Sequence, residues 1–129
     1  MRSRILFISG HPGDARHLSR MLDSLPLAVD HVETLEQARA KLQQEDYCVI
    51  LTEAALPDGK WLDALDLARD CSQKLAVVVT DLHADGRFWA EALNLGAYDL
   101  LAQPFYEPEV RRILHNACTR ASYRAVAAG

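Results

Sequence analysis

The chain has 129 residues, of which 50% are hydrophobic and 25% are charged, and its formal net charge is -4 at pH 7. This length and composition suit one globular domain with its own core and exclude a disordered chain. The negative charge gives no general attraction to nucleic acid or to a membrane surface, and no segment is apolar over enough residues to span a bilayer.

Apolar runs that suit buried or half-buried strands recur along the chain. They predict strands at residues 4–9, 27–32, 47–51, 75–80 and 98–102. Amphipathic segments follow each of these runs. They predict helices at residues 14–24, 34–44, 60–71, 85–95 and from 107 or 108 to about 121. Pro26 ends the first helix, Thr34 and Gln37 form a capping pattern at the start of the second, and Gly96 stops the fourth.

The strands expected at 4–9, 47–51 and 75–80 are essentially apolar, so both of their faces must be covered. This requires a parallel sheet between two helical layers. Right-handed crossovers and a half-polar second strand at one edge favour the strand order 2-1-3-4-5 in a (βα)5 three-layer sandwich. We expect residues 1–122 to form this domain and residues 123–129 to be a frayed tail or the start of a linker.

The three cysteines are Cys48, Cys71 and Cys118. Their odd number and the absence of CxxC spacing predict neither a disulfide framework nor a zinc site. Cys48 is expected to pack in the core. No signal peptide is visible either, so we expect the chain in the cytoplasm. We also expect it to hold neither a metal nor another cofactor.

In a sheet of this order, a crevice opens at the carboxyl ends of the strands, between the first strand and the third. Ser9 and Gly10 are expected to line it from one side and Glu53 from the other. Thr80 and Gln103 arrive from the next two strand ends. The chemistry of the protein is therefore expected at these five positions.

Short signals recur at set distances from the strand ends. They are Pro12 after the first strand, Leu56-Pro57 after Glu53, Thr80 closing the fourth strand, Gly96-Ala97-Tyr98 before the fifth, and Pro104-Phe105 after it. In this combination, residues 4 to 121 resemble a response regulator receiver domain of two-component signalling. The resemblance implies a flavodoxin-like fold of the chemotaxis-receiver type.

Receivers of this family hold Mg2+ with an acidic pair, accept a phosphoryl group on an Asp, and neutralise it with a Lys. Aligned residue by residue, Ser9 and Gly10 stand at the acidic pair, Glu53 at the phosphoacceptor and Gln103 at the Lys. Of the site residues, the resemblance retains Thr80 alone, as the switch hydroxyl. A Gly that is usual in the loop after the third strand is replaced by Trp61.

These replacements remove most of what phosphoryl transfer requires. Mg2+ generally needs one or two carboxylates to displace its water, and phosphoryl transfer depends on positioning and on neutralised charge. We therefore expect a receiver domain that is not an enzyme, is independent of phosphorylation, and acts as a protein interaction or regulatory module. The alternatives are a receiver weakly phosphorylated at Glu53 or elsewhere, and a small-ligand-binding flavodoxin-like protein.

Two hypotheses concern the Glu53 side chain. It would either reach the Thr80 hydroxyl or nearby backbone N–H groups, holding the switch in a fixed, active-like state, or it would point to water. His11 stands beside the crevice and could in principle carry phosphate or bind a metal. Since no second His or Cys stands at ligand spacing, we expect His11 to be an ordinary loop residue.

Charges of opposite sign mark one expected surface. Arg111 and Arg112 lie on the last helix, and Asp85, Glu91 and Asp99 lie on the preceding helix and strand. Such patches can pair across a two-fold axis, although solvated charges explain them equally well. The resemblance implies the same face, made of helix 4, strand 5 and helix 5, for a homodimer. The expected partner is a protein or an output domain, with no direct contact to nucleic acid.

Overall fold

The computed structural model describes residues 3–71, 73–82 and 85–128, with side chains as far as Arg120. Its centre is a five-stranded parallel sheet in the order β2-β1-β3-β6-β7. The strands are β1 (Ser3–Ile8), β2 (Leu27–Val32), β3 (Val49–Glu53), β6 (Ala76–Asp81) and β7 (Asp99–Ala102). Counted along the chain, this is the order 2-1-3-4-5, so the predicted flavodoxin-like topology is confirmed.

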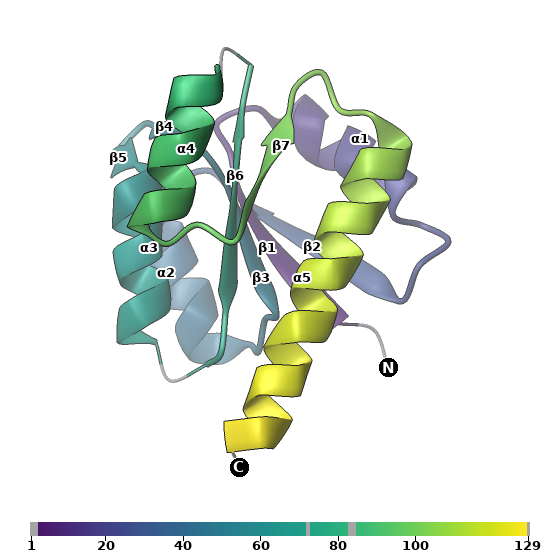
Figure 1. Ribbon diagram of the computed structural model, residues 1–129, viewed down its shortest axis with the longest axis vertical. Helices are drawn as coiled ribbons and strands as arrows, with labels where there is room; N and C mark the ends of the chain where they lie inside the picture. Colours follow the sequence, from purple (N-terminus) through teal and green to yellow (C-terminus); the bar gives the residue numbers. More distant parts are fainter. Residues whose placement is uncertain (1–2, 72, 83–84, 129) are drawn as a thin grey trace.

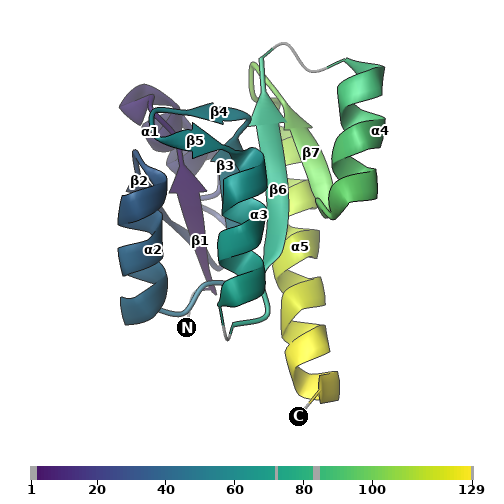
Figure 2. The same ribbon diagram turned by 90° about the vertical axis from the view of Figure 1, so that its left-hand side faces the viewer.

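Helices cover both faces of the sheet. They are α1 (Pro12–Met21), α2 (Leu35–Gln44), α3 (Trp61–Asp70), α4 (Gly86–Leu95) and α5 (Glu107–Ala128). The second, third and fourth helices lie on one face, and α1 and α5 lie on the other (Figures 1 and 2). None of the described helices is both long enough and apolar enough to cross a membrane.

Two apolar cores fill the space between the three layers. In β1, Leu6 and Ile8 pack toward α2 and α3, whereas Ile5 and Phe7 pack toward α1 and α5. All four side chains are fully buried. Successive side chains of a strand point to opposite faces, so an unbroken apolar run is what a doubly covered strand requires.

The turn after β3 belongs to a small antiparallel hairpin that the sequence did not predict. Its strands are β4 (Ala55–Leu56) and β5 (Gly59–Lys60). Between them, the Asp58 carboxylate accepts hydrogen bonds from the backbone N–H groups of Leu35 (2.9 Å) and Glu36 (3.2 Å). The bond from Leu35 is the main cause of a lowered pKa at Asp58. By capping α2, Asp58 fixes the loop that follows Glu53.

Three helix boundaries differ from the prediction by two residues or more, and one of them is the end of the first helix, at Met21 rather than residue 24. The first helix begins at Pro12 rather than residue 14, because proline suits the first helical position and its missing N–H needs no partner there. The last helix continues to Ala128, where a frayed tail was expected from residue 123. Residues 123–128 contain neither Gly nor Pro, so nothing in them ends the helix. A domain boundary at residue 122 stays a prediction.

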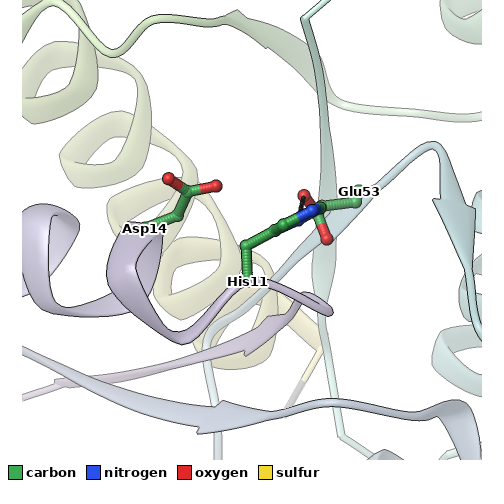
Figure 3. A group of neighbouring side chains, drawn as sticks. All are labelled: His11, Asp14 and Glu53. Atoms are coloured by element: carbon green, nitrogen blue, oxygen red, sulfur yellow. Dashed lines mark hydrogen bonds and ion pairs between the residues drawn. The ribbon is translucent and has the colours of Figure 1, made fainter.

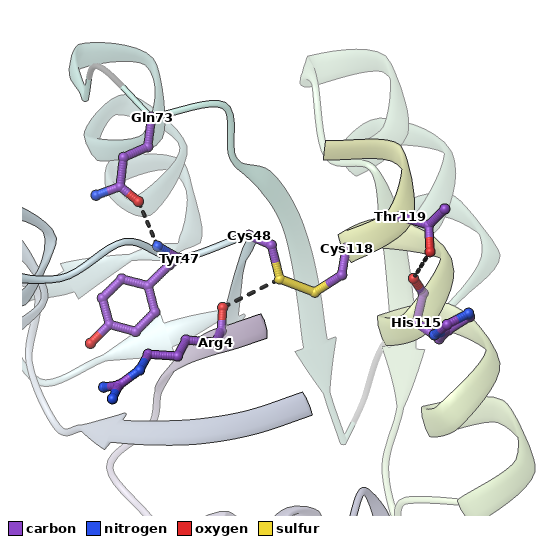
Figure 4. Close-up of a disulfide and its surroundings, with 7 residues drawn as sticks. All are labelled: Arg4, Tyr47, Cys48, Gln73, His115, Cys118 and Thr119. Atoms are coloured by element: carbon purple, nitrogen blue, oxygen red, sulfur yellow. Dashed lines mark hydrogen bonds between the residues drawn. A yellow bond between two sulfur atoms is a disulfide. The ribbon is translucent and has the colours of Figure 1, made fainter. Parts of the chain in front are cut away.

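The prediction that the cysteines form no disulfide is wrong. Cys48 and Cys118 are joined, with their Cα atoms 5.0 Å apart (Figure 4). Cys71 is free. Cys48 immediately precedes β3, and Cys118 lies on the buried side of α5. An odd number of cysteines still allows one disulfide, and here the fold brings together two cysteines that are 70 residues apart in the sequence.

Candidate functional site

The carboxyl ends of β3 and β6 and the segments after β1 and β7 surround a cavity of about 530 Å3. Glu53 is the last residue of β3, and the strand register places it beside Thr80 of β6. Both residues line the cavity, together with Gln103 from the loop after β7 and His11 and Asp14 from the start of α1. The structure therefore brings three of the predicted site residues into one cavity.

The Glu53 carboxylate is held at both oxygens. The backbone N–H of Gly10 donates to Oε1 at 2.8 Å, and His11 Nδ1 lies 2.8 Å from Oε2. The side chain of Glu53 is 13% exposed. Of the two hypotheses for Glu53, contact with a backbone N–H is therefore present, whereas the side chain does not simply point to water.

Thr80 does not contact Glu53. Its side chain is fully buried, and its hydroxyl donates to the backbone carbonyl of Leu101 at 2.7 Å. The hydroxyl thus adds a side-chain hydrogen bond between β6 and β7. Among the described contacts there is no hydrogen bond from Thr80 to Glu53, and the hydroxyl donates to β7 instead.

His11 is the partner of Glu53 that sequence reasoning missed. Since an ionised carboxylate can only accept, the Nδ1–H group donates. This hydrogen bond, and next the negative charge of Glu53, raise the pKa of His11 above 6.5. The missing signal was the register of β1 on β3, which pairs Ile8 with Thr52 and so sets the residues after β1 level with Glu53.

Ser9 and Gly10, which were expected to line the crevice, are not among the residues that line the cavity. Ser9 is fully buried, and its hydroxyl accepts a hydrogen bond from the backbone N–H of His11 at 2.9 Å. The ring of His31 lies 2.8 Å from the Ser9 carbonyl oxygen. Both polar groups of Ser9 therefore shape the turn that presents His11 and the Gly10 N–H to Glu53.

Gln103 contributes an uncharged amide. Its Nε2 atom is buried and has no hydrogen-bond partner among the described residues. The peptide bond from Gln103 to Pro104 is cis. Among the described residues that line the cavity there is neither Lys nor Arg, and its basic side chains are the imidazoles of His11 and His17.

The residues of this cavity do not fit Mg2+, which the resemblance implies. Mg2+ requires near-octahedral oxygen coordination, whereas the side chain that contacts the Glu53 carboxylate here is an imidazole, with His11 Nδ1 2.8 Å from Oε2. His11, Asp14 and Glu53 could bring one ligand atom each within 4.8 Å of one another (Figure 3). One nitrogen and two oxygens suit Zn2+ or a similar first-row cation better than Mg2+.

A second surface of interest is made by α4, β7 and α5 and is called here the α4–β7–α5 face. Asp85, Glu91 and Arg112 are exposed on it, and Asp99 and Arg111 are half-buried. Among the described residues, none of these five forms an ion pair within 4.0 Å.

Helix α4 also carries exposed apolar side chains. Leu93 and Leu95 are 47% and 42% exposed. Ala92 is the fully buried residue of this helix, so α4 packs on the sheet through a narrow stripe and leaves its leucines at the border.

Comparison with known proteins identifies the family. The profile described as response regulator receiver domain matches residues 5–127. Response regulator protein PilR of Pseudomonas aeruginosa is 24% identical over 116 residues, which cover 90% of this chain and 26% of that protein. The chain thus spans about a quarter of the length of this relative.

Solved receiver structures share the fold. The signal receiver domain of a Luxo repressor protein from Vibrio parahaemolyticus superposes with a TM-score of 0.89 at 21% identity, covering 100% of this chain and 99% of that one. The beryllofluoride-activated NtrC4 receiver domain dimer superposes with a TM-score of 0.82 at 24% identity, covering 92% and 98%. With the profile match over residues 5–127, the chain belongs to the response regulator receiver domain family of two-component signal transduction.

Proposed function

We propose that this receiver domain regulates a protein partner in the cytoplasm through its shape and contacts, without being phosphorylated. One observation carries the proposal: the carboxylate at the phosphoacceptor position, Glu53, is already bound by His11 and by the Gly10 N–H. Among the described residues that line the cavity there is also neither a Lys nor an Arg to neutralise a phosphoryl group.

The charges in the cavity disfavour phosphoryl transfer. In phosphoryl transfer, the protein positions the reactants and neutralises the charge that develops on the transferred group. Here Glu53 would have to lose its bond to His11 before it could attack a phosphorus atom, and Gln103 offers an amide in place of a cation. The bond of Glu53 to His11 and the amide at Gln103 each raise the activation barrier to phosphoryl transfer. No described group of the cavity offsets both effects.

The same contacts fix the switch residues in one arrangement. A protonated His11 opposite Glu53 places a positive charge beside the carboxylate. The Thr80 hydroxyl is already hydrogen-bonded to the Leu101 carbonyl. Both arrangements are made by residues of the chain itself, so they do not depend on a phosphodonor. We infer that the surface presented to partners does not change when a phosphodonor is added.

The α4–β7–α5 face is the proposed contact surface. Exposed acids on α4, such as Glu91, and exposed bases on α5, such as Arg112, can pair across a two-fold axis, and Leu93 and Leu95 add apolar area. The NtrC4 receiver is described as a dimer, which supports a homodimer as one use of this face. A heterologous protein or output domain is the other.

Beryllofluoride tests the independence from phosphorylation. The chain is titrated with Mg2+ and beryllofluoride while the amide signals of Glu53 and Thr80 are followed by NMR, with the NtrC4 receiver domain as the positive control. We expect no shift in this chain and large shifts in the control. Saturable shifts around Glu53 that Glu53→Gln abolishes would instead identify a receiver that still accepts phosphate.

Sedimentation equilibrium tests the contact surface. Arg112→Glu places a negative charge opposite the acids of a partner copy, whereas Arg16→Glu makes the same charge change on α1. We expect self-association that weakens in R112E and persists in R16E. A wild-type chain that stays monomeric at high concentration would argue that the face binds a different protein.

A further inference from the structure

The disulfide lies where α5 leaves the sheet. Along α5, the buried stripe of Val110, Ile113, Leu114 and Ala117 ends at Cys118, which is 4% exposed. The next two side chains, Thr119 and Arg120, are exposed. Beyond this point the backbone of α5 projects past the end of the sheet (Figures 1 and 2).

Cys48 joins this point of α5 to the centre of the molecule. It directly precedes β3, the middle strand, and its backbone N–H donates to the Arg4 carbonyl at 2.9 Å. Its Sγ lies 3.3 Å from the same carbonyl oxygen (Figure 4). In the reduced protein, that oxygen would accept the thiol hydrogen of Cys48, so the reduced form also has a partner in place.

We propose that Cys48 and Cys118 form a reversible thiol–disulfide site that controls how firmly the C-terminal part of α5 is held to the sheet. A low-molecular-weight thiol of the glutathione type is the reductant, and the corresponding disulfide is the oxidant. This site is independent of Glu53 and of the proposed lack of phosphorylation. It gives a receiver without a phosphate switch a different chemical input, which acts on one helix of the α4–β7–α5 face.

The exchange reaction has a defined direction. Cys48 is half-buried and Cys118 almost fully buried, so an external thiolate attacks Cys48 Sγ and Cys118 leaves as a thiolate, which takes up a proton. A second thiolate then attacks the external sulfur of the mixed disulfide. Cys48 leaves and is protonated, the two small thiols become one small disulfide, and the protein has gained two electrons and two protons.

The fold does not require a permanent cross-link. A chain of 129 residues with a doubly covered sheet can bury a sufficient core without one. In the cytoplasm, the compartment proposed above for this protein, disulfides are mostly transient and serve in catalysis or redox sensing. Both arguments favour a bond that forms and breaks over a structural one.

Thiol counting measures the chemistry. The full chain is equilibrated in buffers of defined reduced-to-oxidised glutathione ratio, alkylated under denaturing conditions and weighed. We expect one alkylated cysteine, Cys71, at oxidising ratios and all three at reducing ratios, with one two-electron transition. The variant Cys71→Ser should show no alkylated cysteine at oxidising ratios and two at reducing ratios. Three alkylated cysteines at every ratio, or one at every ratio, would overturn the proposal.

Hydrogen exchange measures the consequence. We expect amides of residues 115–128 to exchange about tenfold faster or more in the reduced protein, while the sheet keeps its protection. Cys48→Ser, at a half-buried position, should show the fast exchange without any reductant, and Cys71→Ser should follow the wild type in both states. Equal exchange of residues 115–128 in the oxidised and reduced proteins would refute the control of α5.

Discussion

Reduction of the Cys48–Cys118 disulfide should lower the free energy of unfolding by an amount that follows from its position. The bond closes a loop of 70 residues. In the chain-entropy description, such a loop removes about 15 cal/mol/K from the unfolded ensemble, or about 4 kcal/mol at 25 °C. This is a large part of the roughly 5 to 15 kcal/mol typical of a domain, but it leaves the reduced protein folded. The corresponding loss in Tm is roughly 15 °C.

Urea unfolding followed by circular dichroism, with and without a phosphine reductant, measures this difference. Cys48→Ser should be as unstable as the reduced wild type and should not respond to the reductant. Cys71→Ser is the matched control, because Cys71 is free, and it should lose about 4 kcal/mol on reduction like the wild type. A loss below about 1 kcal/mol, or an equal loss in Cys48→Ser, would refute the assignment of the stability to this bond.

Two further predictions concern the cavity. Since the pKa of His11 is raised above 6.5 by Glu53, the stability that their hydrogen bond contributes is fully present below pH 6.5 and is lost as pH rises through the raised pKa. In an NMR titration, Glu53→Gln should bring the pKa of His11 back toward 6.5 and Glu91→Gln should not, so an unchanged pKa in the first variant would contradict the pairing. Thr80→Val should destabilise the fold by about 1 to 3 kcal/mol in chemical unfolding, because it leaves a buried carbonyl without its donor. Thr119→Val removes a similar hydroxyl-to-carbonyl bond at an exposed site and should cost less than about 0.5 kcal/mol, so equal losses would mean that the Thr80 hydroxyl has no special structural role.

Most of the fold could be predicted because its signals are local and repeated. The half-polar run 27–32 identified the edge strand, and its inner positions are indeed half-buried in β2. The apolar runs of β1, β3 and β6 identified the covered centre of the sheet. The hairpin β4–β5 was missed because strands of two residues carry no periodicity, and its stability comes from the distant contact of Asp58 with α2.

The sequence predicted which strand ends bring residues to the candidate site, but it did not predict which of those residues contact one another. Glu53, Thr80 and Gln103 reach one cavity because parallel strands deliver their carboxyl ends to the same edge of the sheet. The pairing of His11 with Glu53 depends on the register of β1 against β3 and on the turn built by Ser9, and neither is visible in the order of residues. The disulfide was missed for the same reason, since nothing local connects two cysteines separated by 70 positions.

On the proposed function, the cavity around Glu53 does not sustain phosphoryl transfer. The most direct measurement is the intact mass of the chain after incubation with acetyl phosphate and Mg2+, beside a receiver domain known to be phosphorylated. We expect an unchanged mass for this chain and a gain of one phosphoryl group for the control. A stable gain in wild type that disappears in Glu53→Gln would contradict it.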